Sequence, residues 1–534
     1  MEEILKNKGK AILLGNDAVV RGALESGVQF VSTYPGTPAS EIGNTFLKIA
    51  KKAGVYFEFS VNEKTALEAG VGASFSGLKT LVAMKNFGLN VASDALMPFL
   101  YTGSEGPCVI VVADDPSCHS SAQSEQNSRG FSYMAHIPTL EPSSAKEAKE
   151  FVKLGFQLSA KYKLPIMVRL TTRVAHQRMP IDLERMIISK KKGKFIKNKK
   201  KFVTMPPRVL EMKKELFLKL EKMKEENIDI IEKGVGSNGI ICSGVSYLYV
   251  KEVLEELNLN IPVLKIGMFY PLNIKKIKRF LKGLKKVLIV EELEGFLEKE
   301  IKSFCSVTVL GKDVLPLVGE LTPEQVLSAI CKLTGKRYRA DKEFPFKPVK
   351  HLPRFCTGWP TCPYWKLFSA VKQASPKDTI FGGDIGCYMI AALPPHNLYD
   401  YLSCMSSSIG IGHGIKKATN QKLIAFIGDG TFFHSGIPAL MNAVYNKSNP
   451  LIIILDNRIT AMTGQQPNPG MTEDHLVIED ILKALKVKNV KTIDQEEEYD
   501  VLVKTIKEFL NKKELSVIVA RRMCGLLAKR QMRK

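Results

Sequence analysis

The chain has 534 residues, enough for about three domains of roughly 100–200 residues each. Hydrophobic residues make up 45% and charged residues 25% of it, close to globular averages, which excludes wholesale disorder, collagen and coiled coil. No apolar run approaches the roughly 18–20 residues that cross a bilayer, and no signal-like apolar segment precedes the first strand-like residues. We therefore expect a soluble, cytoplasmic protein with no membrane partner.

The net charge of +23 comes mainly from lysines spread along the chain. Arginine is the usual residue for bidentate phosphate recognition. No basic segment here is interleaved with the aromatic residues that a single-strand binder uses for stacking. The densest basic run, residues 190–201, lies in a polar stretch and is typical of a solvated connector. We expect no nucleic-acid partner, although a nucleic-acid or acidic-partner surface remains the alternative.

From residue 10 to about 180, strand-like and helix-like segments alternate, which is typical of a doubly wound α/β domain (1–180). The patterns then predict a Lys-rich connector over 181–235, a smaller α/β domain over 236–345, and a third domain over 346–534 that ends in a short basic tail. The expected strands are 10–14, 29–33, 81–84, 108–113, 165–170, 239–242, 263–266 and 287–290, and the expected helices are 17–26, 66–76 and 246–257.

The most informative stretch is 423–457. An apolar strand ends in Gly428, Asp429 and Gly430, a helical segment follows, and a second apolar strand ends before Asn457. This is the size of a βαβ crossover, so Asp429 and Asn457 should lie just past the carboxyl ends of neighbouring parallel strands, where open α/β sheets bind ligands. The glycines let the backbone approach a diphosphate, and the side-chain oxygens suit Mg²⁺. A surface turn followed by a helix start is the alternative.

With these residues in this order, the third domain resembles the diphosphate-binding (PP-type) domain of thiamine diphosphate enzymes. The resemblance implies that Asp429, Asn457 and the main-chain carbonyl of Ile459 hold Mg²⁺, and that Gly428 and Gly430 line the diphosphate site. It also implies an α/β fold in which two doubly wound parallel-sheet domains, one pyrimidine-binding (Pyr-type) and one PP-type, flank a smaller domain similar to the C-terminal domain of transketolase.

Thiamine catalysis needs a buried carboxyl group beside the aminopyrimidine ring, because burial favours a shared proton. Two glutamates in the first domain are candidates. Glu63 follows the expected strand 55–61 at the start of a helix, and Glu68 lies five residues further on, on a different face of that helix. For Glu63 the alternative role is that of an ordinary acidic residue at a helix N-terminus.

Wider segments resemble the 2-oxoacid:ferredoxin oxidoreductases, and within them the large (alpha) subunits of indolepyruvate ferredoxin oxidoreductases. By that resemblance Glu63 is the activating carboxylate and the Thr37 hydroxyl lies near the substrate carbonyl and the cofactor ring. Arg173 is a candidate for the substrate carboxylate, with a surface ion pair as the alternative. The resembling segments are 34–41, 61–64, 84–94, 171–176, 383–388 and 461–464.

The resemblance implies oxidative decarboxylation of an aryl 2-oxoacid such as indolepyruvate, with coenzyme A taking the acyl group and ferredoxin taking the electrons. It also implies a smaller beta subunit with a γ-type domain, an α₂β₂ assembly, and an active site at a domain or subunit interface. A non-oxidative 2-oxoacid decarboxylase and a non-catalytic paralogue are the alternatives. The retained acidic and amide residues count against the paralogue.

The electron path departs from the family pattern. The large subunits usually end in a ferredoxin-like domain with two Cys-x-x-Cys-x-x-Cys-x-x-x-Cys-Pro runs, and this sequence contains no such run. A proximal [4Fe–4S] cluster is implied in altered form, because Trp359 stands where one partner of the Cys-x-x-Cys pair is expected. Four separate buried thiols are the alternative. The cysteines implied for the cluster are Cys356, Cys362, Cys387 and Cys524.

Overall fold

The computed structural model describes residues 2–121, 123–189, 192–337, 362–471 and 476–532. The chain forms two compact units, residues 1–343 and residues 344–534. The first unit contains two large sheets and a two-stranded ribbon, and the second contains one sheet. The expected α/β class with mainly parallel sheets is confirmed.

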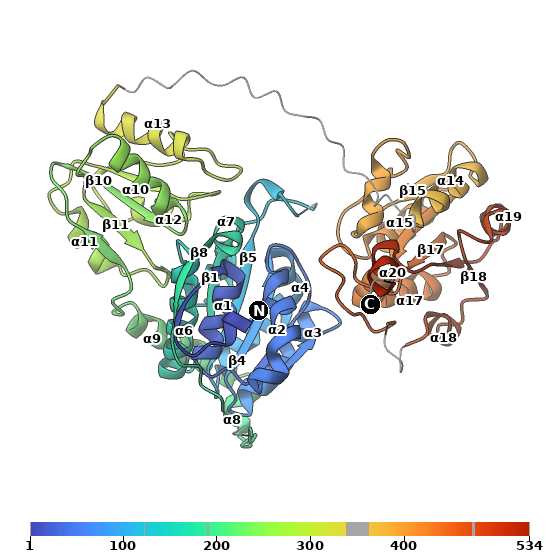
Figure 1. The fold of residues 1–534 in the computed structure, drawn as a ribbon, viewed down its shortest axis with the longest axis horizontal. Helices are drawn as coiled ribbons and strands as arrows, with labels where there is room; N and C mark the ends of the chain where they lie inside the picture. The colour runs from blue at the N-terminus through green and yellow to red at the C-terminus, as the bar shows by residue number, and fades with distance from the viewer. Residues whose placement is uncertain (1, 122, 190–191, 338–361, 472–475, 533–534) are drawn as a thin grey trace. The chain divides into compact units, whose positions relative to one another are not determined.

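The first sheet of the first unit has seven strands, and all of them except one edge strand are parallel. Figure 1 labels β4 and β5, two of its central strands. Buried aliphatic residues fill its central strands, as expected for a sheet covered on both faces. In spatial order the strands are β12 (Met268–Tyr270), β6 (Thr139–Leu140), β7 (Ile166–Thr171), β5 (Cys108–Asp114), β4 (Thr80–Lys85), β2 (Phe30–Thr33) and β3 (Tyr56–Phe59).

Two groups of helices cover this sheet. Gly70 of one helix packs on Val82, and Gly155 of another packs on Val109. In the paired strands Val82 lies beside Ile110, and successive side chains point to opposite faces, so Val82 and Val109 belong to opposite faces of the sheet. One group comprises α1 (Gly15–Glu25), α2 (Ser40–Ala53) and α6 (Ala145–Tyr162), and the other comprises α3 (Glu63–Phe75), α4 (Asn86–Thr102) and α9 (Arg208–Met223).

Two short segments depart from the expected pattern. The strand expected at 10–14 forms as β1 (Gly9–Leu14), but it pairs antiparallel with β8 (Arg178–Leu183) in a separate ribbon. The edge strand β12 comes from the region expected to form the smaller domain, and its Met268 lies opposite Leu140 of β6. The region after residue 236 therefore contributes to the first sheet as well as to its own.

The second sheet, with the order β14 (Thr308–Leu310), β13 (Lys286–Val290), β10 (Asn238–Ser243), β11 (Val263–Ile266) and β9 (Ile230–Glu232), is parallel except for β9. Alternating residues of β10 and β13 enter two different hydrophobic clusters, one on each face. The helices of the first cluster are α10 (Ser246–Glu256) and α13 (Pro323–Thr334), and those of the second are α11 (Ile274–Leu281) and α12 (Phe296–Lys302).

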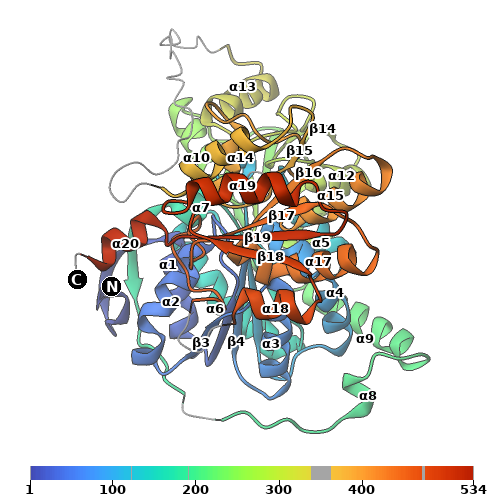
Figure 2. The same ribbon diagram turned by 90° about the vertical axis from the view of Figure 1, so that its right-hand side faces the viewer.

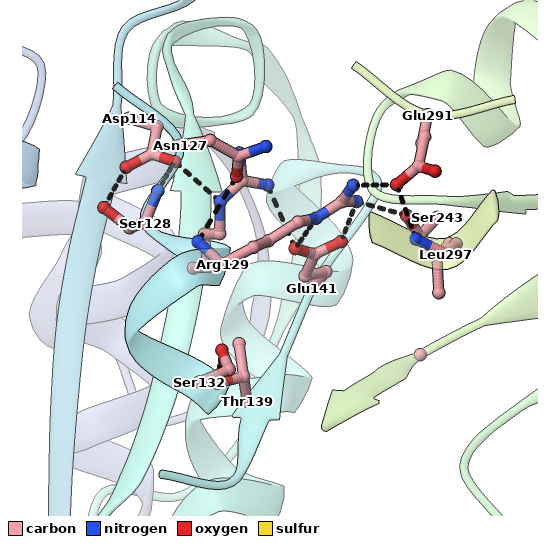
Figure 3. A network of polar contacts seen from close by, with 12 residues as sticks. Asp114, Asn127, Ser128, Arg129, Ser132, Thr139, Glu141, Ser243, Glu291 and Leu297 are labelled. Atoms are coloured by element: carbon pink, nitrogen blue, oxygen red, sulfur yellow. Dashed lines mark hydrogen bonds and ion pairs between the residues drawn. The ribbon is translucent and has the colours of Figure 1, made fainter. Parts of the chain in front are cut away.

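Buried charges join the two sheets of the first unit. The Arg129 guanidinium, on α5 (Arg129–Met134), donates to both carboxylate oxygens of Glu141 at 2.7 and 2.6 Å and reaches Glu291, beyond β13, at 2.6 Å (Figure 3). Burial favours the neutral form of Glu141, but the charges of Arg129 and Arg169 lower its pKa to about 2. Burial raises the pKa of the neighbouring Glu292 to about 7, despite the charge of Arg169.

The second unit contains a five-stranded, fully parallel sheet with helices on both faces (Figure 2). Its strands are β15 (Ile380–Gly382), β16 (Leu423–Gly428), β17 (Leu451–Asp456), β19 (Ser516–Arg521) and β18 (Asn489–Ile493). On one face lie α14 (Tyr364–Ala374) and α19 (Tyr499–Phe509), and on the other lie α15 (Ser407–Ala418), α17 (Ile437–Tyr445) and α18 (Ile478–Ala484). The expected basic tail includes α20 (Gly525–Gln531).

Candidate active site

Glu63 lies where the sequence places it, just after strand β3 and at the start of helix α3. Asn62 caps that helix by accepting a hydrogen bond from the Thr65 N–H at 2.9 Å. The Glu63 residue is 3% exposed, and its carboxyl group packs against Gly88, where an added Cβ would lie 2.6 Å from the Glu63 Cγ. The alternative candidate, Glu68, has a side chain that is 54% exposed and pairs with Lys64 at 3.7 Å.

Thr37 lies in the turn that follows strand β2, at the same edge of the sheet as Glu63. Its hydroxyl is 3.3 Å from the Ser40 hydroxyl at the start of α2. The adjacent Gly36 packs on the stem of Lys85, because a Cβ at position 36 would lie 2.7 Å from the Lys85 Cγ. The Thr37 turn and the end of strand β4 are therefore in contact.

Lys85 and Asp115 extend this edge and were not singled out from the sequence. Lys85 is the last residue of β4. Burial lowers the pKa of its ammonium group, and the charges of Glu63 and Asp115 oppose that shift only in part. Burial disfavours the charge on Asp115, but hydrogen bonds from Thr172 and Ser120 lower its pKa. A lysine at a strand end is usually exposed to solvent, so its residue type does not predict the burial of Lys85. The only hint in the sequence is that Lys85 lies within the 84–94 segment, directly before a helix.

Arg173 lies on α7 (Thr172–His176), after strand β7, and its side chain is 61% exposed. Its guanidinium makes two hydrogen bonds to the Glu320 carboxylate, one of them at 3.0 Å. Together with His119, His176 and Tyr249 it lines a cleft of about 600 Å³. Arg173 therefore forms an ion pair with Glu320, which is the alternative to a role in binding the substrate carboxylate that the sequence analysis gave for this residue.

In the second unit, Asp429 follows β16 and Asn457 follows the adjacent parallel strand β17, so both lie at one edge of the sheet. Asp429 is 3% exposed, and its carboxylate accepts a hydrogen bond from the Asn468 amide at 2.9 Å. Burial and the nearby negative charge of Asp456 raise the pKa of Asp429 to about 7. Asn468 was missed in the sequence because it lies in an irregular loop with no strand end to mark it.

Asn457 begins a tight turn. Its side-chain oxygen accepts a hydrogen bond from the Ile459 N–H at 3.2 Å, and Arg458 between them has a positive φ of 62°. The Asn457 amide donates to the Tyr364 hydroxyl at 2.8 Å. This turn fixes the two groups expected to act with Asp429, the Asn457 side chain and the Ile459 main chain, within one short loop.

The two glycines around Asp429 are required by packing inside the unit. A Cβ at Gly428 would lie 2.8 Å from the ring of Tyr388, and a Cβ at Gly430 would lie 3.0 Å from the Thr460 hydroxyl. The Gly428 N–H also donates to the Tyr388 hydroxyl at 2.8 Å. A larger residue at Gly428 would require Tyr388 or the Asp429 turn to shift, and one at Gly430 would require a smaller adjustment of Thr460.

Three of the four expected cluster cysteines lie among the described residues, and Cys356 lies outside them. The pKa of Tyr364 is raised by burial first, and then by the charges of Cys387, Asp429 and Cys362. These three side chains therefore lie near the Tyr364 hydroxyl. The Cys524 N–H donates to the Asn457 carbonyl at 3.2 Å. Within the described ranges, no three His, Cys, Asp or Glu side chains form a group that could hold a metal ion.

The donor set around Asp429 fits a hard divalent cation. The Asp456 carboxylate lies close enough to disfavour the charge of Asp429, and a bound cation relieves such repulsion. The side-chain oxygen of Asn457 is a ligand type that Mg²⁺ accepts alongside phosphate oxygens and water. The structure is therefore consistent with a magnesium–diphosphate site at this edge of the sheet.

Three family descriptions match the chain. Residues 21–236 match "Pyruvate flavodoxin/ferredoxin oxidoreductase, thiamine diP-bdg", residues 231–315 match "Indolepyruvate oxidoreductase domain", and residues 384–520 match "Thiamine pyrophosphate enzyme, C-terminal TPP binding domain". Among solved structures, a 2-oxoglutarate:ferredoxin oxidoreductase from Magnetococcus marinus is similar in fold, with a TM-score of 0.52 and 20% identity over 61% of this chain and 65% of that chain.

Curated relatives extend this similarity over nearly the whole chain. The indolepyruvate oxidoreductase subunit IorA of Methanothermobacter marburgensis is 42% identical over 97% of this chain and 87% of its own length. The subunit of the same name from Pyrococcus horikoshii is 40% identical over 98% of this chain and 87% of its own length. No helix in the described part of the chain is long and apolar enough to cross a membrane. The chain belongs to the family of thiamine-diphosphate-dependent indolepyruvate oxidoreductase alpha subunits.

Proposed function

We propose that this protein carries out the oxidative decarboxylation of an aryl 2-oxoacid of the indolepyruvate type. The products are the acyl-coenzyme A, CO₂ and two reduced ferredoxins. The observation that carries the proposal is the match to relatives named for indolepyruvate over 97% of the chain, combined with buried Asp429 and Asn457 at the ends of adjacent parallel strands.

Thiamine diphosphate, when bound, supplies a carbon nucleophile that adds to the 2-oxo carbon and accepts the electron pair released with CO₂. We assign to Glu63 the transfer of the proton that this activation requires, through a hydrogen bond to the aminopyrimidine ring. Its burial and its fixed position under Gly88 support this role, because general acid–base catalysis depends on a carboxyl group held at one place. The Thr37 hydroxyl is assigned to the substrate carbonyl.

We assign Mg²⁺ to Asp429, Asn457 and the carbonyl of Ile459. The turn that joins Asn457 to Ile459 and the raised pKa of Asp429 support the assignment, because a bound cation compensates the charge that burial disfavours. We also assign Gly428 and Gly430, on either side of Asp429, to the diphosphate site. Ferredoxin, coenzyme A, and a smaller beta subunit with a γ-type domain in an α₂β₂ assembly complete the proposal.

For the first electron step we propose a [4Fe–4S] cluster on Cys362, Cys387 and Cys524, with Cys356 as the fourth thiolate. Support comes from the positions of Cys362 and Cys387 around Tyr364 and from the backbone contact between Cys524 and Asn457. Tyr364 and Asn457 are hydrogen-bonded to each other, so the three cysteines contact two neighbouring residues. A cluster of this type accepts one electron at a time, as a ferredoxin acceptor requires.

The decisive experiment is an anaerobic panel of 2-oxoacids with a viologen dye, with and without coenzyme A, on protein whose iron and sulfide content has been measured. We expect dye reduction with indolepyruvate that depends on coenzyme A. Iron-free protein that releases an aldehyde from indolepyruvate without any acceptor would instead establish the non-oxidative decarboxylase. Protein that binds no thiamine diphosphate would establish a non-catalytic subunit.

A further inference from the structure

Lys85 is a partly buried cation at the edge of the sheet that carries Glu63. It ends strand β4, and its ammonium lies 4.8 Å from the centre of the Phe87 ring. Glu63 and Asp115 both act on it electrostatically. Nevertheless, none of the hydrogen bonds or ion pairs among the described residues includes the Lys85 ammonium nitrogen.

Close packing fixes Lys85 between two candidate catalytic elements. Its stem lies against Gly36, the neighbour of Thr37, at a distance that leaves no space for a Cβ. Three residues beyond Lys85, Gly88 is packed in the same way against the Glu63 carboxyl group. The Lys85 ammonium therefore belongs to the same local group as Glu63 and the Thr37 turn.

Two other cations of the first unit, Arg173 and Lys79, do have hydrogen-bond partners within the chain. Arg173 is bound to Glu320 through two hydrogen bonds. Lys79, immediately before the same strand β4, donates to the Ser26 carbonyl at 2.6 Å. Asp115, near Lys85, is already bonded to Thr172 and Ser120. A partly buried ammonium without such a partner costs stability unless an anion binds to it.

We infer that the Lys85 ammonium binds the carboxylate of the 2-oxoacid substrate. The inference rests on the proposed function, because it requires a substrate that reacts beside Glu63. In a 2-oxoacid the carbonyl carbon is bonded directly to the carboxylate carbon. A carboxylate bound to Lys85 would therefore hold the carbonyl close to Glu63 and the Thr37 turn. The adjacent Phe87 ring provides an aromatic surface for an aryl side chain. Lys85 thereby replaces Arg173 as the residue for the substrate carboxylate.

The test compares Lys85→Met, Lys85→Gln and Lys85→Arg with the parent enzyme, and uses Lys79→Met as the matched control from the other end of the strand. Calorimetry on the thiamine-diphosphate and Mg²⁺-loaded protein measures binding of indole-3-lactate, which keeps the carboxylate but has no ketone to react. Indole-3-ethanol, which lacks the carboxylate, is the second probe. Titration of thiamine diphosphate and thermal melting report the integrity of each variant.

Loss of one charge-assisted hydrogen bond in a partly buried site weakens binding by about 30-fold. We expect that loss for indole-3-lactate in Lys85→Met and Lys85→Gln, partial recovery in Lys85→Arg, and no change for indole-3-ethanol, for thiamine diphosphate or in Lys79→Met. With active enzyme, the KM for indolepyruvate should rise more than kcat falls.

Two results would overturn the inference. Parental affinity for indole-3-lactate in both neutral variants would show that the carboxylate binds elsewhere. Equal weakening of indole-3-lactate and indole-3-ethanol would show a purely structural role. A parent that oxidises no 2-oxoacid would refute the proposed function, whereas the indole-3-lactate titration would still decide the role of Lys85.

Discussion

The two units place a candidate functional carboxylate at the same topological position but beside charges of opposite sign. Glu63 in the first unit and Asp429 in the second both follow a parallel strand, begin a helical segment and are 3% exposed. Glu63 favours the ammonium form of Lys85 electrostatically, whereas the Asp456 carboxylate disfavours the charge of Asp429.

This difference shows how neighbours assign different chemistry to equivalent positions. A carboxylate beside a second carboxylate is stabilised by a cation, which suits metal binding. A carboxylate beside an ammonium needs no metal and remains available for proton transfer. The topology predicts where a ligand binds, and the side chain next to each acid distinguishes the proposed proton donor, Glu63, from the proposed metal ligand, Asp429. The following predictions test that distinction.

The largest expected effect is on proton transfer in Glu63→Gln. Because a general acid–base group contributes about 10²–10⁴-fold, we expect hydrogen–deuterium exchange at the thiamine C2 to slow by about 1,000-fold, with thiamine diphosphate affinity unchanged. Rapid-quench NMR measures the exchange. Glu68→Gln, an exposed glutamate of the same helix, is the control and should exchange at the parental rate. Parental exchange in Glu63→Gln would remove Glu63 from the mechanism.

Asp429→Asn should weaken cofactor binding, which is the property that Glu63→Gln is expected to leave unchanged. We expect Mg²⁺-dependent thiamine diphosphate binding to weaken by about 100-fold, as for the loss of a charged metal ligand. The cofactor-free protein should melt no lower than the parent, because the substitution removes the repulsion between Asp429 and Asp456. Calorimetric titration and thermal melting measure the two effects, and the exposed Asp378→Asn is the control. Unchanged cofactor affinity would contradict the assigned metal site.

Glu292 tests whether a raised pKa alone marks a functional carboxyl group. Burial raises its pKa to about 7, above the usual 4.5 of the unfolded chain, so its stabilising contribution is complete below about pH 4.5 and is lost as the pH rises through 7. Between pH 5 and pH 8, Glu292→Gln should gain about 2 kcal/mol in free energy of unfolding relative to the parent. Urea denaturation at both pH values measures this.

Exposed Glu294→Gln is the control for that experiment and should show no such pH dependence. Thiamine diphosphate affinity should stay at the parental value in Glu292→Gln. If the affinity falls as it does in Asp429→Asn, a raised pKa does not distinguish structural from metal-binding acids in this protein.

The smallest expected effect comes from moving Glu63 without removing it. A Cβ at position 88 would lie 2.9 Å from the Glu63 Oε1, so Gly88→Ala must displace the carboxyl group by a few tenths of an ångström. We expect C2 exchange to slow by about 10-fold, since small misplacements of catalytic groups are costly. Gly72→Ala, on α3 with no atom within 4 Å of the added Cβ, is the control. Parental exchange in Gly88→Ala would show that Glu63 tolerates displacement.

Long apolar segments made much of the fold predictable. The strand that ends at Gly428 and the strand that ends at Asp456 are adjacent and parallel, as their spacing in the chain predicts. Short strands carry too few residues for a periodic signal, so neither the three-residue β12 nor the two-residue β6 was expected. The strand at 10–14 was expected, but its antiparallel pairing with β8 depends on long-range contacts that no local pattern records.

The candidate site was predictable only where residue type and strand end coincide. Glu63, Asp429 and Asn457 each follow a clear strand, so their positions were evident from the sequence. Lys85 also ends a strand, but lysine is usually exposed, and its burial depends on the packing of Gly36 from another turn. Asp456 ends its strand, but no local pattern shows that its carboxylate acts on Asp429 from the neighbouring strand. Asn468 lies in a loop, so its amide contact with Asp429 also required the structure.

The edge strand β12 limits how this chain can be divided or recombined. Residues 268–270 pair with β6 of the first sheet although they follow β9, β10 and β11 of the second sheet in the chain. A truncation after residue 235 would uncover that sheet edge and leave Arg129 without Glu291, exposing unpaired backbone groups that promote aggregation. Chimeras that exchange the middle region between relatives should therefore carry the 268–270 strand together with its 139–140 partner, because the two strands pair directly.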